Sequence, residues 1–361
     1  MIRSASLNLE GWSGKTLLLT IISATLFFGI LEIVARLDAF QAQLTTPPMG
    51  SGHYQLGQKL AYLDREIQKN GRMDCIMIGS SMVDVGFDPR AFASGYREIK
   101  GQDIRCFNFG IDSSSAASTR AIARVMLEDY HPRLLIIGTD ARDYVVPPDA
   151  LEIAVLVDTP WIKYRLGNLS LDGWLLDISY FYRYRQHLNR LLRFNYEGTL
   201  LEASHQNESL LPNGYTPLEM VSPEVNQPPD PNNDSYEVQY YSRIFSSYQM
   251  IDTNLDALEQ TLASNKSEVQ ILVVEMPVSD GYYYFFGNGK KDQRQFVDAI
   301  NRLAARYQIP FWQTGSMDLI SNDEWADYSH LNRRGAEHFS AWLGSQVAQA
   351  EIHKMLRVFD E

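Results

Sequence analysis

An uncharged apolar run near the N-terminus constrains this chain more than any other feature. The run extends from Thr16 to Leu31 and, after the single acidic residue Glu32, continues through residues 33–35. About 20 helical residues, each rising about 1.5 Å, span the roughly 30 Å of a bilayer core. The sequence therefore predicts a transmembrane signal anchor over residues 15–35, preceded by a short cytoplasmic tail over residues 1–14.

The residues around this run favour an extracytoplasmic body. Arg3 and Lys15 precede the run, and positively charged flanks tend to stay in the cytoplasm. The alternatives are a cleaved signal peptide and a buried helix of a soluble domain. A cleaved signal usually ends in small residues of the A-x-A type, whereas Arg36 and Leu37 follow Ala35. We therefore expect a single-pass membrane protein whose larger domain is periplasmic or lies at the cell surface.

Charge and composition exclude two classes of function. The chain has 44 Asp+Glu against 32 Lys+Arg, a formal net charge of −12, and no basic cluster that would bind nucleic-acid phosphates. Its seven histidines lack HExxH or other ligand spacing, so we expect neither a bound metal nor another cofactor. Cys75 and Cys106 lie on two of the predicted strands. A disulfide between them is conceivable outside the cytoplasm, but buried free thiols are the favoured expectation.

Downstream of residue 70, short apolar segments alternate with segments of helical periodicity. The apolar segments have the composition of buried strands: 74–81, 104–110, 133–139, 269–277 and 309–312. Helical periodicity marks 115–130, 292–307 and 334–350. Apolar strands that alternate with helices predict a parallel sheet covered on both faces. Residues 36–69 are expected to be a juxtamembrane linker that ends in a polar helix.

The pattern changes between about residues 151 and 250, where we expect an insertion of helices and loops. Residues 174–194 are aromatic and basic with helical character, and residues 225–235 are rich in Pro and Asn, which is typical of a loop. The insertion either packs on the sheet as a small helical subdomain, covers the active site as a lid, or presents a face to a membrane partner.

Small polar residues follow three of the predicted strands, and ligands of open parallel sheets bind beyond the carboxyl ends of the strands. Ser81 lies at the tight turn after the first strand. A serine hydroxyl needs an adjacent base to act as a nucleophile. Far downstream, two residues separate Asp327 from His330. This spacing lets the carboxylate accept the proton of one ring nitrogen and leave the other nitrogen to act as the base.

Four segments, in this order and at these positions, resemble the sequence blocks of the SGNH/GDSL hydrolase superfamily. They are GSSMVDVGFDP (79–89), NFGIDSSS (108–115), GTDARD (138–143) and DYSHLNRRGAEHF (327–339). The resemblance implies an α/β fold, a flavodoxin-like three-layer αβα sandwich with a parallel sheet, over residues 70–361. It also implies a catalytic triad of Ser81, His330 and Asp327.

The oxyanion hole implied by the resemblance departs from the family pattern. The family uses the backbone N–H of the nucleophile, here Ser81, a glycine N–H of the second block and an asparagine side chain of the third block. Ser113 occupies the glycine position, where its N–H can still donate, and Arg142 falls where asparagine is expected. Arg142 either stabilises an oxyanion or an anionic substrate, or forms a structural ion pair with Asp143 or Asp140.

Further residues are candidate substrate contacts. They lie in the second and third blocks and in an aromatic run at 282–286: Asn108, Gly110, Asp143, Tyr283 and Tyr284. Five successive aromatic residues cannot all face one core, so we expect some of them to be exposed. They form either a platform for carbohydrate or acyl chains, or a surface that packs against the membrane or the insertion.

Three features narrow the resemblance to one branch of the superfamily. They are the predicted membrane helix, the Gly-Ser-Ser of the first block and the Asp-x-x-His-Leu-Asn of the last block. They are similar to SGNH-like proteins of cell-envelope polymer acylation, such as the D-alanine-transfer protein of teichoic acid synthesis and the alginate O-acetylation proteins. The segment MPVSDGYYYFFG (276–287) is similar to the former. This branch implies acyl transfer through Ser81 to a hydroxyl of a glycopolymer, with a multispanning membrane O-acyltransferase as partner. The alternatives are a plain extracytoplasmic esterase for small or lipid esters and a non-catalytic scaffold subunit of an acyltransferase complex.

Overall fold

The structure is a computed structural model that describes residues 14–37, 40, 54–145, 159–185, 209–222, 225–230, 235–264, 268–315 and 319–359. Most of the predicted cytoplasmic tail, part of the juxtamembrane linker and parts of the insertion lie outside the described residues. The order of helices and strands within the described part follows the alternation predicted from the sequence.

The core is a five-stranded parallel sheet. Its strands are β1 (Cys75–Gly79), β2 (Cys106–Gly110), β3 (Leu134–Thr139), β4 (Gln270–Glu275) and β5 (Phe311–Trp312). They pair in parallel in the order β2-β1-β3-β4-β5, which is the flavodoxin-like order. The first three strands are buried along their whole length, as expected for a sheet covered on both faces. The predicted fold class is therefore confirmed.

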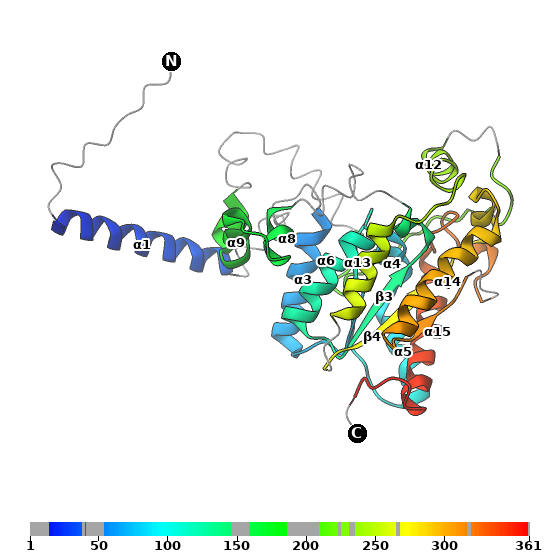
Figure 1. Cartoon of the computed structure of the whole chain (residues 1–361). Coiled ribbons are helices and arrows are strands. Elements are labelled where there is room, and N and C mark those ends of the chain that lie inside the picture. Colours follow the sequence, from blue (N-terminus) through cyan, green and yellow to red (C-terminus); the bar gives the residue numbers. More distant parts are fainter. Residues whose placement is uncertain are drawn as a thin grey trace, which may run out of the picture.

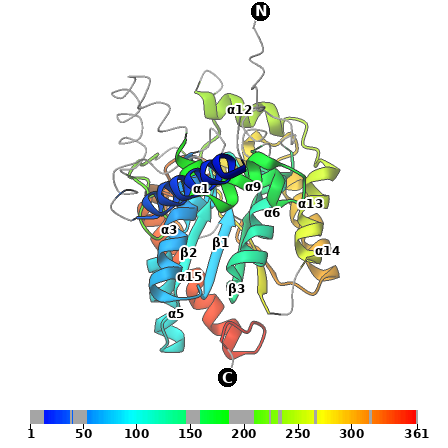
Figure 2. The same ribbon diagram turned by 90° about the vertical axis from the view of Figure 1, so that its left-hand side faces the viewer.

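Helices cover both faces of the sheet and make the sandwich three layers deep (Figures 1 and 2). The helices are α3 (Tyr54–Asn70), α4 (Ser81–Gly86), α5 (Pro89–Lys100), α6 (Ala116–Val125), α13 (Asp252–Ala263), α14 (Lys290–Arg306) and α15 (Arg333–Ile352). α5 and α15 pack together on one face, while α3, α6 and α13 lie on the other. Glycines allow the close contact of α5 with α15, because a Cβ on Gly95 would lie 2.0 Å from the carbonyl oxygen of Ala341.

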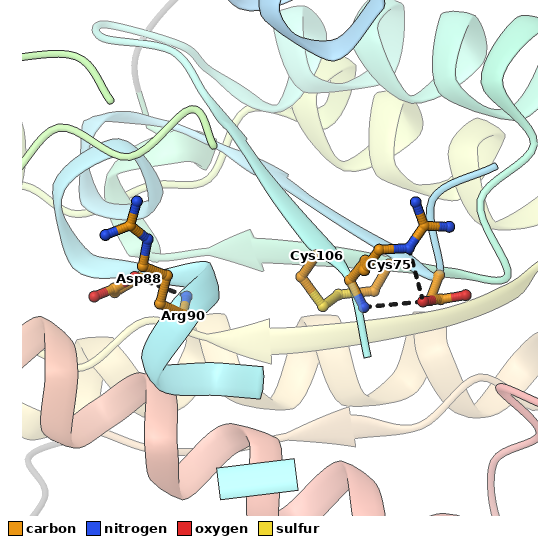
Figure 3. Close-up of a disulfide and its surroundings, with 6 residues drawn as sticks. Cys75, Asp88, Arg90 and Cys106 are labelled. Carbon is orange, nitrogen blue, oxygen red and sulfur yellow. Dashed lines mark hydrogen bonds and ion pairs between the residues drawn. A yellow bond between two sulfur atoms is a disulfide. The ribbon is translucent and has the colours of Figure 1, made fainter. Parts of the chain in front are cut away.

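A disulfide joins β1 to β2 where the two strands begin, so the expectation of free thiols was wrong (Figure 3). The parallel register pairs Cys75 directly with Cys106, and their Cα atoms are 4.5 Å apart. That separation falls within the range that a disulfide can bridge. The register of the strands, which composition does not reveal, brings the two thiols together.

The apolar run forms helix α1 (Gly14–Arg36), which extends away from the sandwich (Figure 1). Among the described residues, α1 is the one helix that is long and apolar enough to cross a membrane. It is therefore a membrane anchor or a signal sequence.

The described parts of the insertion pack at two separate places. Near α1 lie α8 (Pro160–Arg165) and α9 (Leu171–Ile178), followed by a short helical segment over residues 180–185. At the far end of the molecule lies α12 (Tyr236–Phe245) (Figure 1). The long helix suggested by residues 174–194 is thus interrupted at Ser179, and its last part lies outside the described residues. Residues 225–230 form a loop, as predicted, and 231–234 are outside the described part.

Candidate active site

Three glycines at the ends of neighbouring strands determine where Ser81 lies. β1, β2 and β3 carry Gly79, Gly110 and Gly138 at or near their carboxyl ends. A Cβ on Gly110 would lie 2.2 Å from the backbone nitrogen of Asp84, and one on Gly79 or Gly138 would lie 2.5 or 2.4 Å from the Val83 side chain. The absence of these Cβ atoms lets α4 lie directly on the strand ends. Ser81 consequently lies at the carboxyl ends of the strands, where the direction of the crossovers reverses between β1 and β3.

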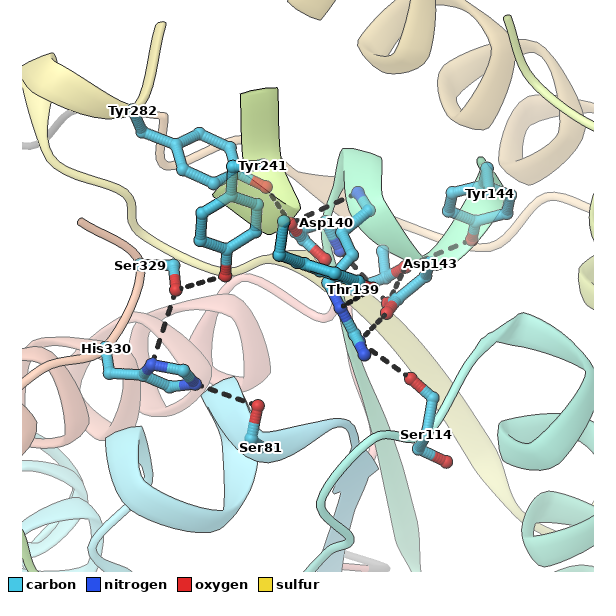
Figure 4. Close-up of polar contacts among 12 residues, drawn as sticks. Ser81, Ser114, Thr139, Asp140, Asp143, Tyr144, Tyr241, Tyr282, Ser329 and His330 are labelled. Atoms are coloured by element: carbon cyan, nitrogen blue, oxygen red, sulfur yellow. Dashed lines mark hydrogen bonds and ion pairs between the residues drawn. The ribbon is translucent and has the colours of Figure 1, made fainter. Parts of the chain in front are cut away.

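The three predicted triad residues form one chain of hydrogen bonds. The Oγ of Ser81 lies 2.8 Å from Nε2 of His330, and Nδ1 of His330 lies 2.6 Å from Oδ2 of Asp327. The backbone N–H groups of Ser329 and His330 donate to Oδ1 of Asp327 at 2.9 and 2.7 Å. The Asp-x-x-His loop therefore folds back on itself. Figure 4 shows the imidazole of His330 pointing at Ser81.

The charges around His330 stabilise its protonated form. Burial disfavours the imidazolium, but Asp327, Glu237 and Asp112 outweigh it and raise the pKa of His330 to about 9. Burial likewise opposes the charge of Asp327, yet His330 and the backbone N–H of Ser329 keep the pKa of Asp327 below its usual value. The carboxylate of Asp327 consequently stabilises the imidazolium of His330 once it forms. The neutral imidazole, which is the form that acts as a base, becomes populated as the pH rises toward 9.

A second carboxylate, Glu237, lies beside Asp327 and comes from α12 of the insertion. Its Oε1 accepts a hydrogen bond of 3.2 Å from the backbone N–H of Tyr328. Burial and the neighbouring Asp327 raise the pKa of Glu237 to about 8. Within the described residues, no group of three or more His, Cys, Asp or Glu is arranged to hold a metal ion. Asp327 and Glu237 both raise the pKa of His330.

α12 also contacts the histidine loop through Tyr241. Its hydroxyl lies 2.7 Å from Oγ of Ser329, which in turn lies 3.3 Å from Nδ1 of His330 and 3.3 Å from Oδ1 of Asp327 (Figure 4). The Tyr241 ring stacks on Phe245 of the same helix, with ring centroids 5.6 Å apart. The insertion thus supports the loop that carries the base.

Two of the predicted oxyanion donors are backbone N–H groups. Ser81 is the first residue of α4, so its N–H has no acceptor within the helix and is open to an external one. Ser113 has a φ of 58°, in the left-handed region that glycine adopts most easily. This conformation agrees with the position of Ser113 at the glycine of the family's second block. Donation by either N–H to an oxyanion remains a prediction.

Helix α3 contacts the other side of the turn that carries Ser81. Oε1 of Gln55 accepts the backbone N–H of Asp112 at 2.8 Å, and its Nε2 donates to Oδ2 of Asp84 at 3.0 Å. Lys59 forms an ion pair with Oδ1 of Asp84, which also accepts the Thr216 hydroxyl at 2.9 Å. One helix therefore holds both α4 and the loop that carries the predicted oxyanion donor.

The ion pair of Lys59 and Asp84 is buried, with the two side chains 0% and 1% exposed. Burial raises the pKa of Asp84 to about 6, although Lys59 opposes this shift, and burial lowers the pKa of Lys59. The charged form of each side chain is thus stabilised mainly by the other, because burial keeps water away from both.

Arg142 forms an ion pair with Asp143, which is one of the two roles expected from the sequence. Its Nη1 lies 3.8 Å from Oδ1 of Asp143 and donates to the carbonyl of Ser114 at 3.1 Å. Its Nε donates to the Tyr240 hydroxyl at 3.2 Å. These contacts hold the guanidinium between the third-block turn and α12, and a role toward an oxyanion stays a prediction.

Three of the candidate substrate residues make contacts within the fold. The amide nitrogen of Asn108 donates to backbone carbonyls of α4 and Phe87 at 2.7 to 3.0 Å, and its oxygen accepts the N–H of Gly110. Oδ2 of Asp143 accepts the Thr139 hydroxyl at 3.0 Å, which closes the third-block turn. Substrate contacts by Asn108, Gly110 and Asp143 stay a prediction.

Most of the aromatic run packs against α12. Tyr283 is buried, and the Phe286 ring stacks on Phe245 with centroids 4.2 Å apart. The Tyr282 hydroxyl donates to Asp140 at 2.6 Å. Tyr284 is 57% exposed and is the one member of the run that is available as a platform. Packing against α12 thus accounts for Tyr282, Phe285 and Phe286.

Sequence reasoning did not identify Glu237 and Tyr241 on α12, nor Gln55 and Lys59 on α3, as part of the site. None of them belongs to a motif, and each lies far along the chain from the groups it contacts. The one available signal for α3 is the presence of Lys59 among apolar positions of an amphipathic helix.

No protein-family model matches the chain, and no curated protein matches it. Solved structures match it with low identity. A gut microbial diltiazem-metabolizing enzyme is 13% identical, with a TM-score of 0.36, over 76% of this chain and 47% of its own, so this chain spans about half the length of that protein. An inhibitor-bound aryl esterase of M. smegmatis is 10% identical, with a TM-score of 0.35, over 76% of this chain and 98% of its own. A lipase/acylhydrolase from Enterococcus faecalis is 14% identical, with a TM-score of 0.35, over 80% of this chain and 100% of its own.

Proposed function

We propose that the protein is a membrane-anchored, extracytoplasmic serine esterase or acyltransferase of the SGNH type that acts on acyl groups of a cell-envelope glycopolymer. The observation that carries the proposal is the chain of hydrogen bonds from Ser81 through His330 to Asp327, with distances of 2.8 and 2.6 Å. This is the arrangement that activates a serine hydroxyl in acyl transfer.

In the proposed reaction, Oγ of Ser81 attacks the acyl carbonyl while its proton moves to Nε2 of His330. Asp327 stabilises the resulting imidazolium. The tetrahedral oxyanion forms next to the free N–H of Ser81 at the start of α4. Collapse of this intermediate breaks the ester bond, and His330 gives the proton to the leaving alkoxide. A water molecule or an acceptor hydroxyl then attacks acyl-Ser81 by the same steps in reverse and restores the free serine.

Two features support an extracytoplasmic location. The disulfide between Cys75 and Cys106 is of the kind that persists in oxidising compartments. The apolar helix α1 precedes the sandwich, with basic residues on its N-terminal side. Both fit a protein that is held at the outer face of a membrane by its N-terminal helix.

Transfer to a glycopolymer, in contrast to hydrolysis, is the part of the proposal carried by the sequence resemblance. Such a transferase is expected to work with a multispanning membrane O-acyltransferase that supplies the acyl group. Tyr284, which is exposed, is the remaining candidate for contact with a sugar ring.

The test is covalent labelling of the full-length protein in detergent with a fluorophosphonate probe, measured by intact mass. We expect one probe per chain in the wild type and none in Ser81→Ala or His330→Ala. Ser94→Ala, which changes an exposed serine on α5, is the matched control and should label as the wild type does. Absence of labelling over hours in protein with intact secondary structure would contradict the serine mechanism.

A second measurement separates hydrolysis from transfer. The protein is acylated with an activated acetyl ester, and release of the acetyl group is followed with and without an added polysaccharide. Acetylated polysaccharide formed in competition with free acetate supports transfer. Release to water alone, at a rate that the polysaccharide does not change, supports the plain esterase.

A further inference from the structure

Next to the C-terminal end of α1, the structure has an exposed apolar stripe that the candidate active site does not use. On α9, Leu171, Trp174 and Ile178 lie three and four residues apart, which places them on one face of the helix. These side chains are 72%, 42% and 45% exposed, and Leu169, just before the helix, is completely exposed. Large apolar side chains gathered in this way usually mark a contact surface.

The opposite face of α9 is well packed. A Cβ on Gly173 would lie 2.1 Å from the carbonyl oxygen of Pro160, so α9 rests directly on α8. Asp177 accepts the Trp161 indole N–H at 2.9 Å and pairs with Arg165 at 3.3 Å. The stripe therefore belongs to a folded helical pair and is not an apolar face left bare by loose packing.

The residues that follow α9 are bonded to the end of the apolar helix α1. The carboxylate of Glu32 accepts the Ser179 hydroxyl at 2.8 Å and the backbone N–H groups of Tyr180 and Phe181 at 3.0 and 3.1 Å. Arg36 donates to the carbonyl of the last residue of α9 at 3.0 Å. Glu32 is the one acidic residue within the apolar run of α1, and these contacts satisfy it.

Contacts further toward the N-terminus of α1 indicate how deep residues 180–183 lie relative to the membrane surface. The Phe181 ring lies 6.3 Å from the ring of Phe28, which precedes Arg36 by about 12 Å along the helix axis. Arg36 and Arg183 both stack on Tyr180, each with its guanidinium carbon 4.5 Å from the ring centroid. Tyrosine and arginine with apolar neighbours are characteristic of the headgroup level of a bilayer.

We propose that Leu169 and α9 form an interfacial foot whose apolar stripe inserts among the lipids of the outer leaflet, beside the point where α1 leaves the bilayer. The occupant is lipid because the stripe is bonded to an apolar helix whose own large side chains are exposed over most of its length. The inference rests on the proposed anchoring of the chain by α1. With two contacts instead of one, the catalytic sandwich has a fixed orientation relative to the membrane.

The test uses the full-length protein in phosphatidylcholine nanodiscs, with a bimane fluorophore on one introduced cysteine at a time. Both native cysteines are in the disulfide, so the labelling is specific. Leu171→Cys reports on the foot, and Leu26→Cys in the middle of α1 reports on the anchor. Met355→Cys, whose native side chain is 66% exposed near the distant C-terminus, is the matched control. Quenching is measured with a shallow lipid-borne nitroxide and with aqueous iodide.

We expect lipid-borne quenching at position 171 to exceed that at position 355 by about twofold or more, and iodide quenching to fall correspondingly. Iodide quenching at 171 equal to that at 355, with position 26 in lipid, would overturn the foot and leave the anchor intact. Shielding of 171 from both quenchers would mean that protein covers the stripe, which also overturns the proposal. Absence of lipid quenching at position 26 would instead refute the anchoring in the proposed function.

Discussion

Two carboxylate clusters flank Ser81, one buried and one half-buried, and they differ in how their charges are balanced. On the α3 side, Asp84 is paired with Lys59 and accepts hydrogen bonds from the side chains of Gln55 and Thr216. On the histidine side, Asp327 and Glu237 face a single ionisable base. The first cluster is balanced by the lysine that pairs with Asp84, whereas the second is balanced only when His330 takes up a proton. The difference teaches that burial of a carboxylate does not by itself indicate a catalytic group, because the available counter-charge decides its role.

The comparison predicts first that damage on the histidine side removes activity without unfolding the protein. Ser81→Ala and His330→Ala should each lower ester hydrolysis by about 10⁴-fold or more, since the nucleophile and its base act as one unit. The double variant should be no slower than either single one. Initial rates with an activated ester, alongside thermal melting, provide the measurement. A single variant that keeps a tenth of the activity would contradict the triad.

On the α3 side, in contrast, the expected loss is in stability. Lys59→Met should lower the free energy of unfolding by about 3–5 kcal/mol, because it leaves Asp84 buried without its cation. Asp84 can then take up a proton, so the loss should be smaller at pH 5 than at pH 8. Urea unfolding at both pH values measures this. Lys69→Met, at an exposed position of the same helix, is the matched control, and an equal effect of both substitutions would refute the role of the pair.

Gln55 connects Asp84 on α4 to the loop that carries Ser113. Its removal should affect the rate more than the stability. Gln55→Met removes the acceptor of the Asp112 N–H, which loosens the loop carrying Ser113. We expect kcat to fall by about tenfold with little change in KM, because the oxyanion donor is misplaced in the transition state. Steady-state kinetics would show this, with Gln68→Met on the exposed face of α3 as the control. A change confined to KM would argue against a positioning role.

The smallest expected effect is a shift in pH dependence. Glu237 is among the groups that raise the pKa of His330, so Glu237→Gln should lower that pKa and move the acid limb of kcat/KM to lower pH, by up to about one unit. The gain in relative activity should be largest near pH 8 and above, where Glu237 carries its charge, and small at pH 7, where Glu237 is mostly protonated. The pH profile of Glu98→Gln, at an exposed position of α5, should match that of the wild type. A shift of the limb to higher pH would contradict the assigned charge effect.

The sequence revealed the sheet and the three hydrogen-bonded residues because both depend on local patterns. Short apolar segments give strands, and the two-residue spacing between Asp327 and His330 brings carboxylate and ring together within one loop. Residues that tertiary packing brings together from distant parts of the chain were not predictable from local patterns. Glu237 reaches Asp327 across 90 residues of chain, and the pairing of Cys75 with Cys106 depends on the register of two strands. Arg142 has a motif position, but its partners decide its role.

The three strand-end glycines have a consequence for the recognition of distant relatives. A chain can retain a serine, a histidine and an aspartate in the right order and still be inactive if one added methyl group at position 79, 110 or 138 displaces the turn that carries the hydroxyl. Loss of activity during divergence can therefore begin at residues with no reactive atoms. In such relatives, glycine at these three strand-end positions therefore indicates catalytic activity, as the reactive side chains do.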